Sequence, residues 1–147
     1  MRRLTLLRHA EAANAAGGRD FDRPLSDTGI REARAAAIAL AAALPAPDLV
    51  VASSALRTMH TARLLRDQAW AEVPIVAELS LYLATADVLF DYLKGLDDGL
   101  GNVLIVGHNP GLSECCARIA DDAQDFSLGT GAWRAFERRI DRWADLR

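Results

Sequence analysis

The sequence is poor in cysteine and contains no long apolar segment. Its two cysteines, Cys115 and Cys116, are adjacent, and neighbouring cysteines seldom form a disulfide with each other. No second pair offers metal-ligand spacing, so we expect both to be small apolar residues on a helix in a reducing compartment. No apolar run approaches the ~18 residues that span a membrane. The basic start of the chain precedes an apolar run too short for a signal peptide, and we therefore expect a cytoplasmic protein.

The sequence also has no large excess of either charge. Its 17 Lys and Arg residues stand against 20 Asp and Glu residues, for a net charge of -3. This balance gives no bulk electrostatic reason to expect binding to nucleic acid or to a membrane, so any anion site must be local. The chain has no internal repeat, no low-complexity linker and no GxGxxG or P-loop spacing. We expect a single domain over residues 1–147 and a monomer.

What the sequence does contain is three apolar runs that each end abruptly in polar or charged residues. The runs are residues 4–7 before Arg8 and His9, residues 49–51 before Ser53, Ser54 and Arg57, and residues 103–106 before His108. A buried strand cannot simply continue into such residues, so each switch marks a strand end at a surface or cleft. In open α/β sheets, ligands bind at the carboxyl ends of the parallel strands. We therefore expect two histidines and two arginines to meet at one edge of a sheet.

Strand-like and helix-like segments alternate along the chain. We predict strands at residues 3–8, 49–52, 73–76, 102–106 and 131–136. We predict helices at residues 30–44 (with the N-cap at Ser26 or Asp27), 57–68, from Thr85 or Asp87 to about residue 95, and 110–120. Loops are expected at residues 10–25 and 121–129, whereas residues 137–147 fit either a strand end or a short helix. This alternation predicts a three-layer α/β/α sandwich with a mostly parallel central sheet, with Pro74 on a strand towards its edge.

His9 is the first candidate for catalysis. The fixed positive charge of Arg8 beside it disfavours protonation and leaves a neutral imidazole nitrogen able to attack an electrophile. Histidine is an accepted nucleophile in covalent catalysis, and phosphoryl groups suit it because the phosphoramidate that forms is readily hydrolysed. The alternative is a structural or solvated histidine, which is the more frequent case for a single histidine and is our interpretation of His60.

Arg8, Arg57 and His108 complete the candidate site. Phosphoryl transfer requires three equatorial oxygens to be neutralised and held in line, and two guanidinium groups can do this. His108 would add a second imidazole donor, and the turn at residues 107–111 would add backbone N–H groups at a helix N-terminus. A metal on His9 and His108 would lack a third ligand and would be repelled by two arginines, so we expect no metal and no cofactor. The tryptophans are expected to be packing residues.

Five segments agree, in order and spacing, with the motifs of a known family. They are Leu-Arg-His-Ala-Glu at 7–11, Arg-Pro-Leu-Ser-Asp-Thr-Gly at 23–29, Ser-Ser-Ala-Leu-Arg-Thr-Met-His-Thr-Ala at 53–62, Val-Gly-His-Asn-Pro-Gly-Leu at 106–112 and Gly-Thr-Gly-Ala at 129–132. The first resembles the Arg-His-Gly signature of the histidine phosphatase (phosphoglycerate mutase-like) superfamily. The whole set covers most of the chain and is similar to the short SixA-type phosphohistidine phosphatases.

The resemblance implies a phosphoglycerate mutase-like fold and a metal-independent phosphatase with a phosphohistidine intermediate on His9. Arg8, Arg57 and His108 would then form the phosphate pocket. Arg23 has two interpretations. It either contributes to the phosphate pocket or substrate approach, or it pairs at the surface with an aspartate at position 20 or 22.

The sequence departs from the wider superfamily in two places. Ala10 stands where glycine is usual, although alanine is common in the SixA-like branch. Members that act on sugar phosphates carry an acidic proton donor after the third strand. Glu78 lies near that place, in a segment that reproduces their motif poorly.

The weak acid motif bears on the substrate. General acid catalysis is worth roughly 10²–10⁴-fold for an alkoxide leaving group, whereas an imidazole leaves with less need of a proton. No connection has room for a lid domain, and an uncovered site suits a phosphate on a protein surface. We therefore expect a signal-transduction phosphatase that acts on phosphohistidine of a protein partner. The alternatives are a phosphatase of small phosphomonoesters with Glu78 as its acid and an inactive phosphoprotein-binding module, while a mutase would need a closed site.

Overall fold

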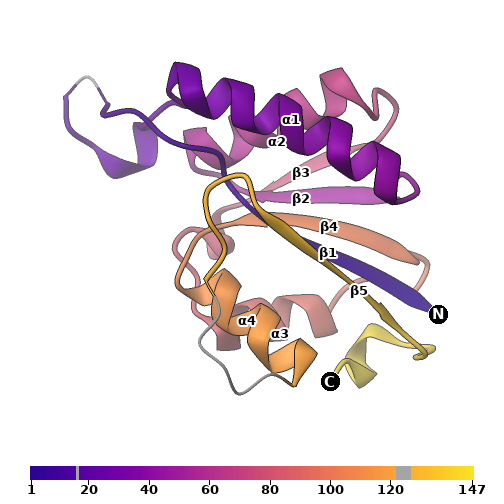
Figure 1. Ribbon diagram of the computed structural model, residues 1–147. Coiled ribbons are helices and arrows are strands. Elements are labelled where there is room, and N and C mark those ends of the chain that lie inside the picture. The colour runs from indigo at the N-terminus through magenta and orange to yellow at the C-terminus, as the bar shows by residue number, and fades with distance from the viewer. Residues whose placement is uncertain (16, 122–126) are drawn as a thin grey trace.

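A five-stranded sheet forms the middle of the molecule (Figure 1). The computed structural model describes residues 1–15, 17–121 and 127–147, and within them the strand order is β3-β2-β4-β1-β5. The strands are β1 (Arg2–Arg8), β2 (Leu49–Ser53), β3 (Ile75–Glu78), β4 (Asn102–Gly107) and β5 (Trp133–Arg138). The first four run parallel to one another, and β5 pairs antiparallel with β1. The predicted mostly parallel sheet is confirmed.

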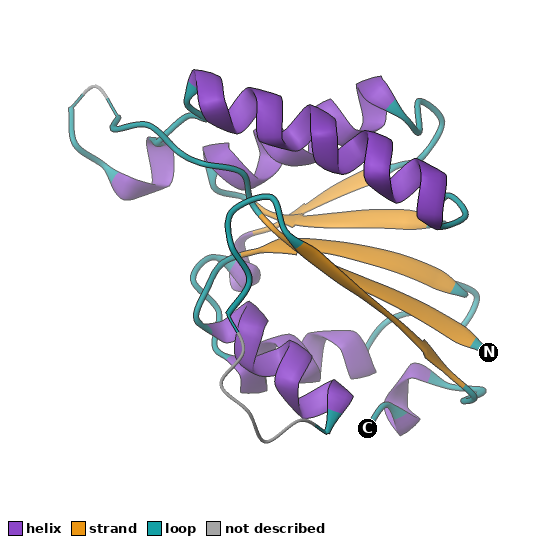
Figure 2. Cartoon of the chain, in the orientation of Figure 1, coloured by secondary structure: helices purple, strands orange, loops and turns teal. Residues whose placement is uncertain are grey.

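Helices lie on both faces of this sheet, as Figure 2 shows. In the described part of the chain, α1 (Asp27–Ala43) and α2 (Leu56–Gln68) pack on one face, and α3 (Ala86–Lys94) and α4 (Gly111–Ala120) on the other. Successive side chains of a strand point to opposite faces. In β1, Leu6 therefore belongs to the buried cluster with α3 and α4, whereas Leu7 belongs to the cluster with α1 and α2. The molecule is the three-layer sandwich that the sequence predicts.

The strand predictions hold best at the centre of the sheet. β4 lies between β1 and β2 and is buried along its length after Asn102. The edge position of β3 is also confirmed, but this strand begins at Ile75, two residues later than predicted. Proline has no N–H to donate to a sheet, and Pro74 lies just before the strand, where its carbonyl accepts a hydrogen bond from the Val50 N–H at 3.0 Å.

α1 begins at a side-chain cap. The Ser26 hydroxyl accepts a hydrogen bond from the backbone N–H of Gly29 at 3.0 Å, so the helix starts at Asp27, as the predicted cap requires. Its buried positions are mostly small: Gly29, Ala33, Ala36, Ala37 and Leu40. Small side chains on this face allow close packing, and the helix ends at Ala43 before the two prolines that follow.

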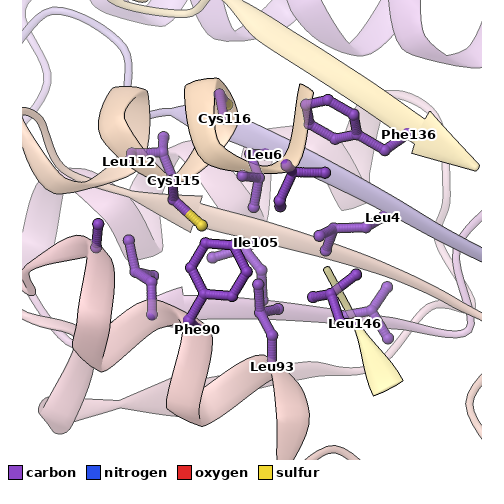
Figure 3. Packing of buried hydrophobic residues seen from close by; sticks show 14 of the residues in the cluster. Leu4, Leu6, Phe90, Leu93, Ile105, Leu112, Cys115, Cys116, Phe136 and Leu146 are labelled. Carbon is purple, nitrogen blue, oxygen red and sulfur yellow. The ribbon is translucent and has the colours of Figure 1, made fainter. Parts of the chain in front are cut away.

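The larger buried cluster contains both cysteines (Figure 3). Cys115 and Cys116 lie on α4 and are fully buried, near Leu112 and Phe90. Burial raises the pKa of each thiol to about 12, so both are neutral and weakly reactive. The prediction of two apolar packing residues on a helix is confirmed.

The C-terminal tail folds back onto the molecule. β5 continues to Arg138, and a 3₁₀ helix follows at Trp143–Asp145. Trp143 is fully buried in the same cluster as the cysteines, and its indole N–H donates to the Leu100 carbonyl at 2.8 Å. The tail therefore combines both predicted alternatives, a strand end and a short helix. Of the other tryptophans, Trp70 is buried in the cluster with α1 and α2, and Trp133 is partly buried and packs against that cluster.

The loop after β1 carries two pieces of local structure. Within the described part of residues 10–25, Ala12 and Leu25 form an isolated antiparallel bridge, and Asp20–Asp22 form a 3₁₀ turn. Of the predicted loop at residues 121–129, residues 122–126 lie outside the described part of the chain. None of the described helices is both long and apolar enough to cross a membrane.

Candidate active site

The three predicted strand ends meet at one cavity. Because β1, β4 and β2 are adjacent and parallel, their carboxyl ends lie at the same edge of the sheet. The cavity at this edge has a volume of about 270 Å³. Its lining residues are Arg8, His9, Glu11, Ala12, Arg23, Arg57, Leu83, His108, Asn109 and Thr130. The sequence-predicted group of two histidines and two arginines is therefore brought together.

His9 is held as a neutral imidazole with one unprotonated ring nitrogen. Its Nδ1 lies 2.7 Å from the Ala10 carbonyl oxygen, and a carbonyl can only accept, so Nδ1 carries the proton. Nε2 then accepts a hydrogen bond from Arg57 Nε at 3.4 Å. Burial is the main cause that lowers the pKa of His9 to about 4, and the charges of Arg57 and Arg8 add to it. The sequence predicted the effect of Arg8 and missed the larger effect of burial.

Arg57 connects both histidines to the loop after β1. It lies in the first turn of α2 and is 3% exposed. One guanidinium nitrogen, Nη2, lies 3.3 Å from His108 Nδ1 and 3.0 Å from Asp20 Oδ2. The other, Nη1, donates to the Asp20 backbone carbonyl at 2.8 Å. Arg57 is thus the central donor of the site.

Arg8 has an unused donor. Its Nη1 donates to the Leu128 carbonyl at 3.1 Å. Its Nε is buried and has no hydrogen-bond partner among the described residues. An unpaired buried donor costs about 1–3 kcal/mol, so an anion in the cavity would find a guanidinium group with spare bonding capacity.

His108 faces the cavity from the end of β4. Its ring centre lies 5.4 Å from that of His9, and its Nε2 lies 2.8 Å from the Ser53 hydroxyl oxygen. Burial, followed by the charge of Arg57, lowers the pKa of His108 to about 3. The ring is therefore neutral at pH 7, like that of His9.

The predicted contribution of N–H groups from the turn at residues 107–111 stays a prediction, and two N–H groups just after this turn are already paired. The N–H of Leu112 donates to the His108 carbonyl at 3.0 Å, and the N–H of Ser113 donates to Asn109 Oδ1 at 3.2 Å. The Asn109 side chain thus supplies an acceptor at the start of α4 that the N-cap residue Pro110 does not.

Asp20 pairs with Arg57, and the sequence alone did not predict this contact. Its carboxylate accepts hydrogen bonds from Arg57, from Arg23 Nη1 at 3.3 Å and from the Tyr82 hydroxyl. The Tyr82 hydrogen bond is the main cause that lowers the pKa of Asp20 to about 2, and Arg57 and Arg23 add to it. Asp20 is therefore an anion bound to the guanidinium group that contacts both histidines.

Arg23 pairs with an aspartate, as one of its interpretations predicts, and its role towards a phosphate stays a prediction. It lines the cavity, and it also pairs with Asp20 while its Nε donates to the Ala13 carbonyl at 3.1 Å. Glu78 is placed differently. It ends β3, and its carboxylate accepts a hydrogen bond from the Tyr92 hydroxyl at 3.2 Å, while the residues that line the cavity do not include it. The structure does not bring this candidate acid to the histidines.

A buried hydroxyl group connects the segment after His9 to the helix that carries Arg57. Thr61, one turn after Arg57 on α2, accepts a hydrogen bond from the Ala10 N–H at 3.1 Å and donates to the Arg57 carbonyl at 2.8 Å. His60, on the same helix, is partly buried outside the cavity lining, in agreement with a structural role. The motif at residues 53–62 therefore contains both a cavity residue and its support.

The motif around residues 23–29 docks α1 onto the loop after His9. A Cβ atom added to Gly29 would lie 2.0 Å from the Glu11 carbonyl oxygen, so this contact requires glycine. Glu32 extends the contact. Its carboxylate accepts hydrogen bonds from the Glu11 N–H at 2.8 Å and from the Thr130 hydroxyl at 3.0 Å.

Among the described residues, no three His, Cys, Asp or Glu side chains lie close enough together to hold a metal ion. A buried neutral histidine can act as a nucleophile, and guanidinium groups beside it can neutralise the oxygens of a phosphoryl group. The chain belongs to the histidine phosphatase superfamily. The family model for branch 1 of this superfamily matches residues 4–80.

Individual relatives agree with this assignment. An uncharacterized protein from Mycobacterium tuberculosis is 36% identical over 114 residues, which are 78% of this chain and 70% of that protein. The structure of a candidate phosphohistidine phosphatase SixA from Agrobacterium tumefaciens is similar with a TM-score of 0.85 and 29% identity, over 94% of this chain and 92% of that one. The structure of a candidate phosphohistidine phosphatase SixA from Nakamurella multipartitia has a TM-score of 0.80 and 30% identity, over 99% of this chain and 88% of that one.

A more distant structure shares the fold alone. A candidate alpha-ribazole-5'-P phosphatase from Escherichia coli has a TM-score of 0.73 at 20% identity, over 97% of this chain and 93% of that one. The phosphoglycerate mutase-like architecture and the similarity to SixA proteins are confirmed.

Proposed function

We propose that this protein is a phosphohistidine phosphatase that removes the phosphoryl group from a histidine of a protein partner. Membership of the histidine phosphatase superfamily supports phosphatase activity, and the similarity to SixA structures supports the choice of substrate. The observation that carries the proposal is the state of His9, whose proton lies on Nδ1 and whose Nε2 keeps its lone pair at neutral pH.

In the proposed reaction, the Nε2 lone pair of His9 forms a bond to phosphorus. The bond between phosphorus and the substrate imidazole breaks, and its electron pair stays on the imidazole nitrogen, which takes a proton from water. Arg8 and Arg57 neutralise the charge on the phosphoryl oxygens. Water then attacks phospho-His9, the N–P bond breaks, its electron pair returns to Nε2, and inorganic phosphate leaves.

The carboxylates near the cavity favour phosphohistidine over an alkyl phosphate. An alkoxide leaving group needs a proton donor. Glu78 is bonded to Tyr92 outside the cavity lining, and Asp20 is held ionised by Tyr82, Arg57 and Arg23. The imidazole of a phosphohistidine leaves with less need of an acid. A cytoplasmic, monomeric enzyme that acts on proteins in signal transduction and needs no metal or cofactor remains part of this proposal.

Steady-state hydrolysis tests the proposal. The substrates are phosphohistidine, free and on a carrier protein, and p-nitrophenyl phosphate, each with a chelator present and with His9→Ala as the control. We expect chelator-resistant activity that depends on His9 and favours phosphohistidine. Equal activity of His9→Ala would contradict the assignment of the nucleophile.

A second candidate function is hydrolysis of small phosphomonoesters, because a structural neighbour that shares the fold is described as acting on such a phosphate. A preference for p-nitrophenyl phosphate over both forms of phosphohistidine would favour it. The third alternative, an inactive binding module, explains the site less well, since a binder has no need of an activated nucleophile. Anion binding without any turnover that depends on His9 would favour that module.

A further inference from the structure

Ser53 is a buried polar residue in direct contact with the site. It is the last residue of β2 and is fully buried. Its hydroxyl oxygen lies 2.8 Å from His108 Nε2 and accepts a hydrogen bond from the Ala55 N–H at 3.3 Å. Its backbone carbonyl accepts from the Thr58 hydroxyl at 2.7 Å. Both the main chain and the side chain of Ser53 are therefore fixed against α2 and β4.

The position of the proton on His108 follows from its two partners. Arg57 Nη2 lies 3.3 Å from His108 Nδ1, and a guanidinium group can only donate. Nδ1 must therefore be the acceptor, and the proton of the neutral ring is on Nε2. The Nε2–H group donates to the Ser53 hydroxyl oxygen. In this state His108 offers no N–H group to a ligand in the cavity.

A bound phosphoryl group requires the opposite arrangement. Its oxygens can only accept, so His108 stabilises them only when Nδ1 carries a proton. If the ring stays neutral, Nε2 then becomes an acceptor and needs a buried donor. A serine hydroxyl can donate or accept because its O–H bond rotates, and the Ala55 N–H leaves the hydroxyl proton of Ser53 free for this role.

We propose that Ser53 is a positioning residue that supports both tautomers of His108 and so allows the ring to change from an acceptor to a donor when an anion binds. The inference rests on the proposed function of the same site. One proton leaves Nε2 and one arrives at Nδ1, both exchanged with water, so the ring is neutral before and after. Ser53 changes from acceptor to donor at the same time, and no nitrogen of the buried ring is left without a partner.

The first test follows the ring nitrogens by NMR. We would label the protein with ¹⁵N-histidine, assign His108 with the His108→Asn variant, and record the imidazole nitrogens at pH 7 with and without tungstate. We expect the proton on Nε2 in the free protein and on Nδ1 in the tungstate complex. An unchanged tautomer overturns the inference. A His108 imidazolium ring in the tungstate complex also overturns the inference, because Nε2 then keeps its proton. The inference is likewise overturned if tungstate leaves the signals of His9 and His108 unchanged.

The second test separates positioning from simple stability. Ser53→Ala removes the hydroxyl that pairs with Nε2, whereas Thr58→Val removes a buried hydroxyl of the same turn that bonds the Ser53 carbonyl instead. We expect Ser53→Ala to lower kcat about tenfold with KM within twofold, as for a buried group left unpaired, and to abolish the tautomer change. Thr58→Val should lower Tm and keep kcat within twofold.

A hydroxyl-retaining variant completes the comparison. Ser53→Thr should recover the tautomer change and most of kcat. Equal losses of kcat in Ser53→Ala and Thr58→Val would overturn the inference, because a loosened turn would then explain both. The NMR experiment does not depend on turnover. If the protein hydrolyses none of the substrates, the proposed function is contradicted, and the tungstate titration still decides the role of Ser53.

Discussion

The carboxylate of Asp20 lies on the guanidinium group of Arg57, with 3.0 Å between Oδ2 and Nη2. This Nη2 also contacts His108, and the Nε of the same guanidinium contacts His9. Asp20 therefore accepts hydrogen bonds from N–H groups of Arg57 that a phosphoryl group would otherwise accept. Because two anions on one guanidinium repel each other, a ligand must displace Asp20 or share Arg57 with it.

Removal of the Asp20 charge is expected to strengthen anion binding. An ion pair with a partly exposed partner is worth at most about 1 kcal/mol, and the Asp20 side chain is 45% exposed. Asp20→Asn should therefore lower the Kd of tungstate about two- to fivefold, measured by calorimetry. Asp22→Asn is the matched control, since Asp22 lies in the same 3₁₀ turn and pairs with the exposed Arg19. Equal effects of both variants would contradict a specific competition at Arg57.

His9 is expected to titrate far below a normal histidine. Burial and two arginines lower its pKa from 6.5 to about 4, so the proposed nucleophile is mostly unprotonated at pH 5 and above. In an NMR titration, the chemical shifts of the His9 imidazole should change little from pH 7 to pH 5. In kinetics, protonation of His9 should cause no decline of kcat/KM for p-nitrophenyl phosphate near pH 6.5. A midpoint near 6.5 would contradict the buried, neutral state.

The same shift makes folding stability depend on pH. Between pH 6.5 and pH 4 the unfolded chain binds a proton at His9 that the folded chain does not bind, so the free energy of unfolding decreases as pH falls through this range. At pH 5 we expect a loss of about 2 kcal/mol from His9 relative to pH 7. Urea unfolding at both pH values measures it. His9→Asn is the control, and an unchanged pH dependence in that variant would contradict the prediction.

Gly29 is expected to tolerate no side chain. Its Cβ would overlap the Glu11 carbonyl oxygen, which belongs to the main chain and cannot move aside freely. Gly29→Ala should lower the free energy of unfolding by about 2 kcal/mol or more and reduce kcat, since the loop after His9 must shift. Gly101→Ala is the control, because the nearest atom to its added Cβ is 3.7 Å away on a side chain. Similar losses in both variants would contradict this explanation.

Glu78→Gln tests the remaining candidate acid. The Glu78 carboxylate accepts from Tyr92 outside the cavity lining, and glutamine retains an acceptor for that hydroxyl. We expect kcat on both phosphohistidine and an alkyl phosphate, whose alkoxide leaving group needs a proton, to stay within about twofold of the original protein, far below the 10²-fold loss of a general acid. A large loss confined to the ester would restore Glu78 as a proton donor and favour the small-molecule alternative.

Much of this architecture is predictable because it depends on local patterns. Apolar runs that end in charged residues located the carboxyl ends of β1, β2 and β4, and parallel pairing then forces Arg8, His9 and His108 into one region. Ser26 and Thr85 have cap side chains, so the starts of α1 and α3 could be found within a few residues.

The remaining contacts depend on distances between segments that no local pattern encodes. Asp20 lies in a loop without periodicity, and its place on Arg57 follows from the path of the whole loop. The contact of Ser53 with His108 requires β2 and β4 to be neighbours, which strand order alone decides. Burial of His9 likewise needs the assembled fold, so the sequence predicted the direction of its pKa shift and missed the main cause.

The bridge made by Glu32 has a consequence for local opening of the structure around His9. Glu32 joins the segment after β1 to Thr130, while the Gly131 N–H contacts the carbonyl oxygens of both Arg8 and His9. Gly131 lies more than a hundred residues after His9 in the sequence, so the surroundings of His9 depend on long-range contacts. A local opening that separates β5 from β1 would remove these contacts, and the backbone around His9 should then lose its protection from hydrogen exchange together with this edge of the sheet.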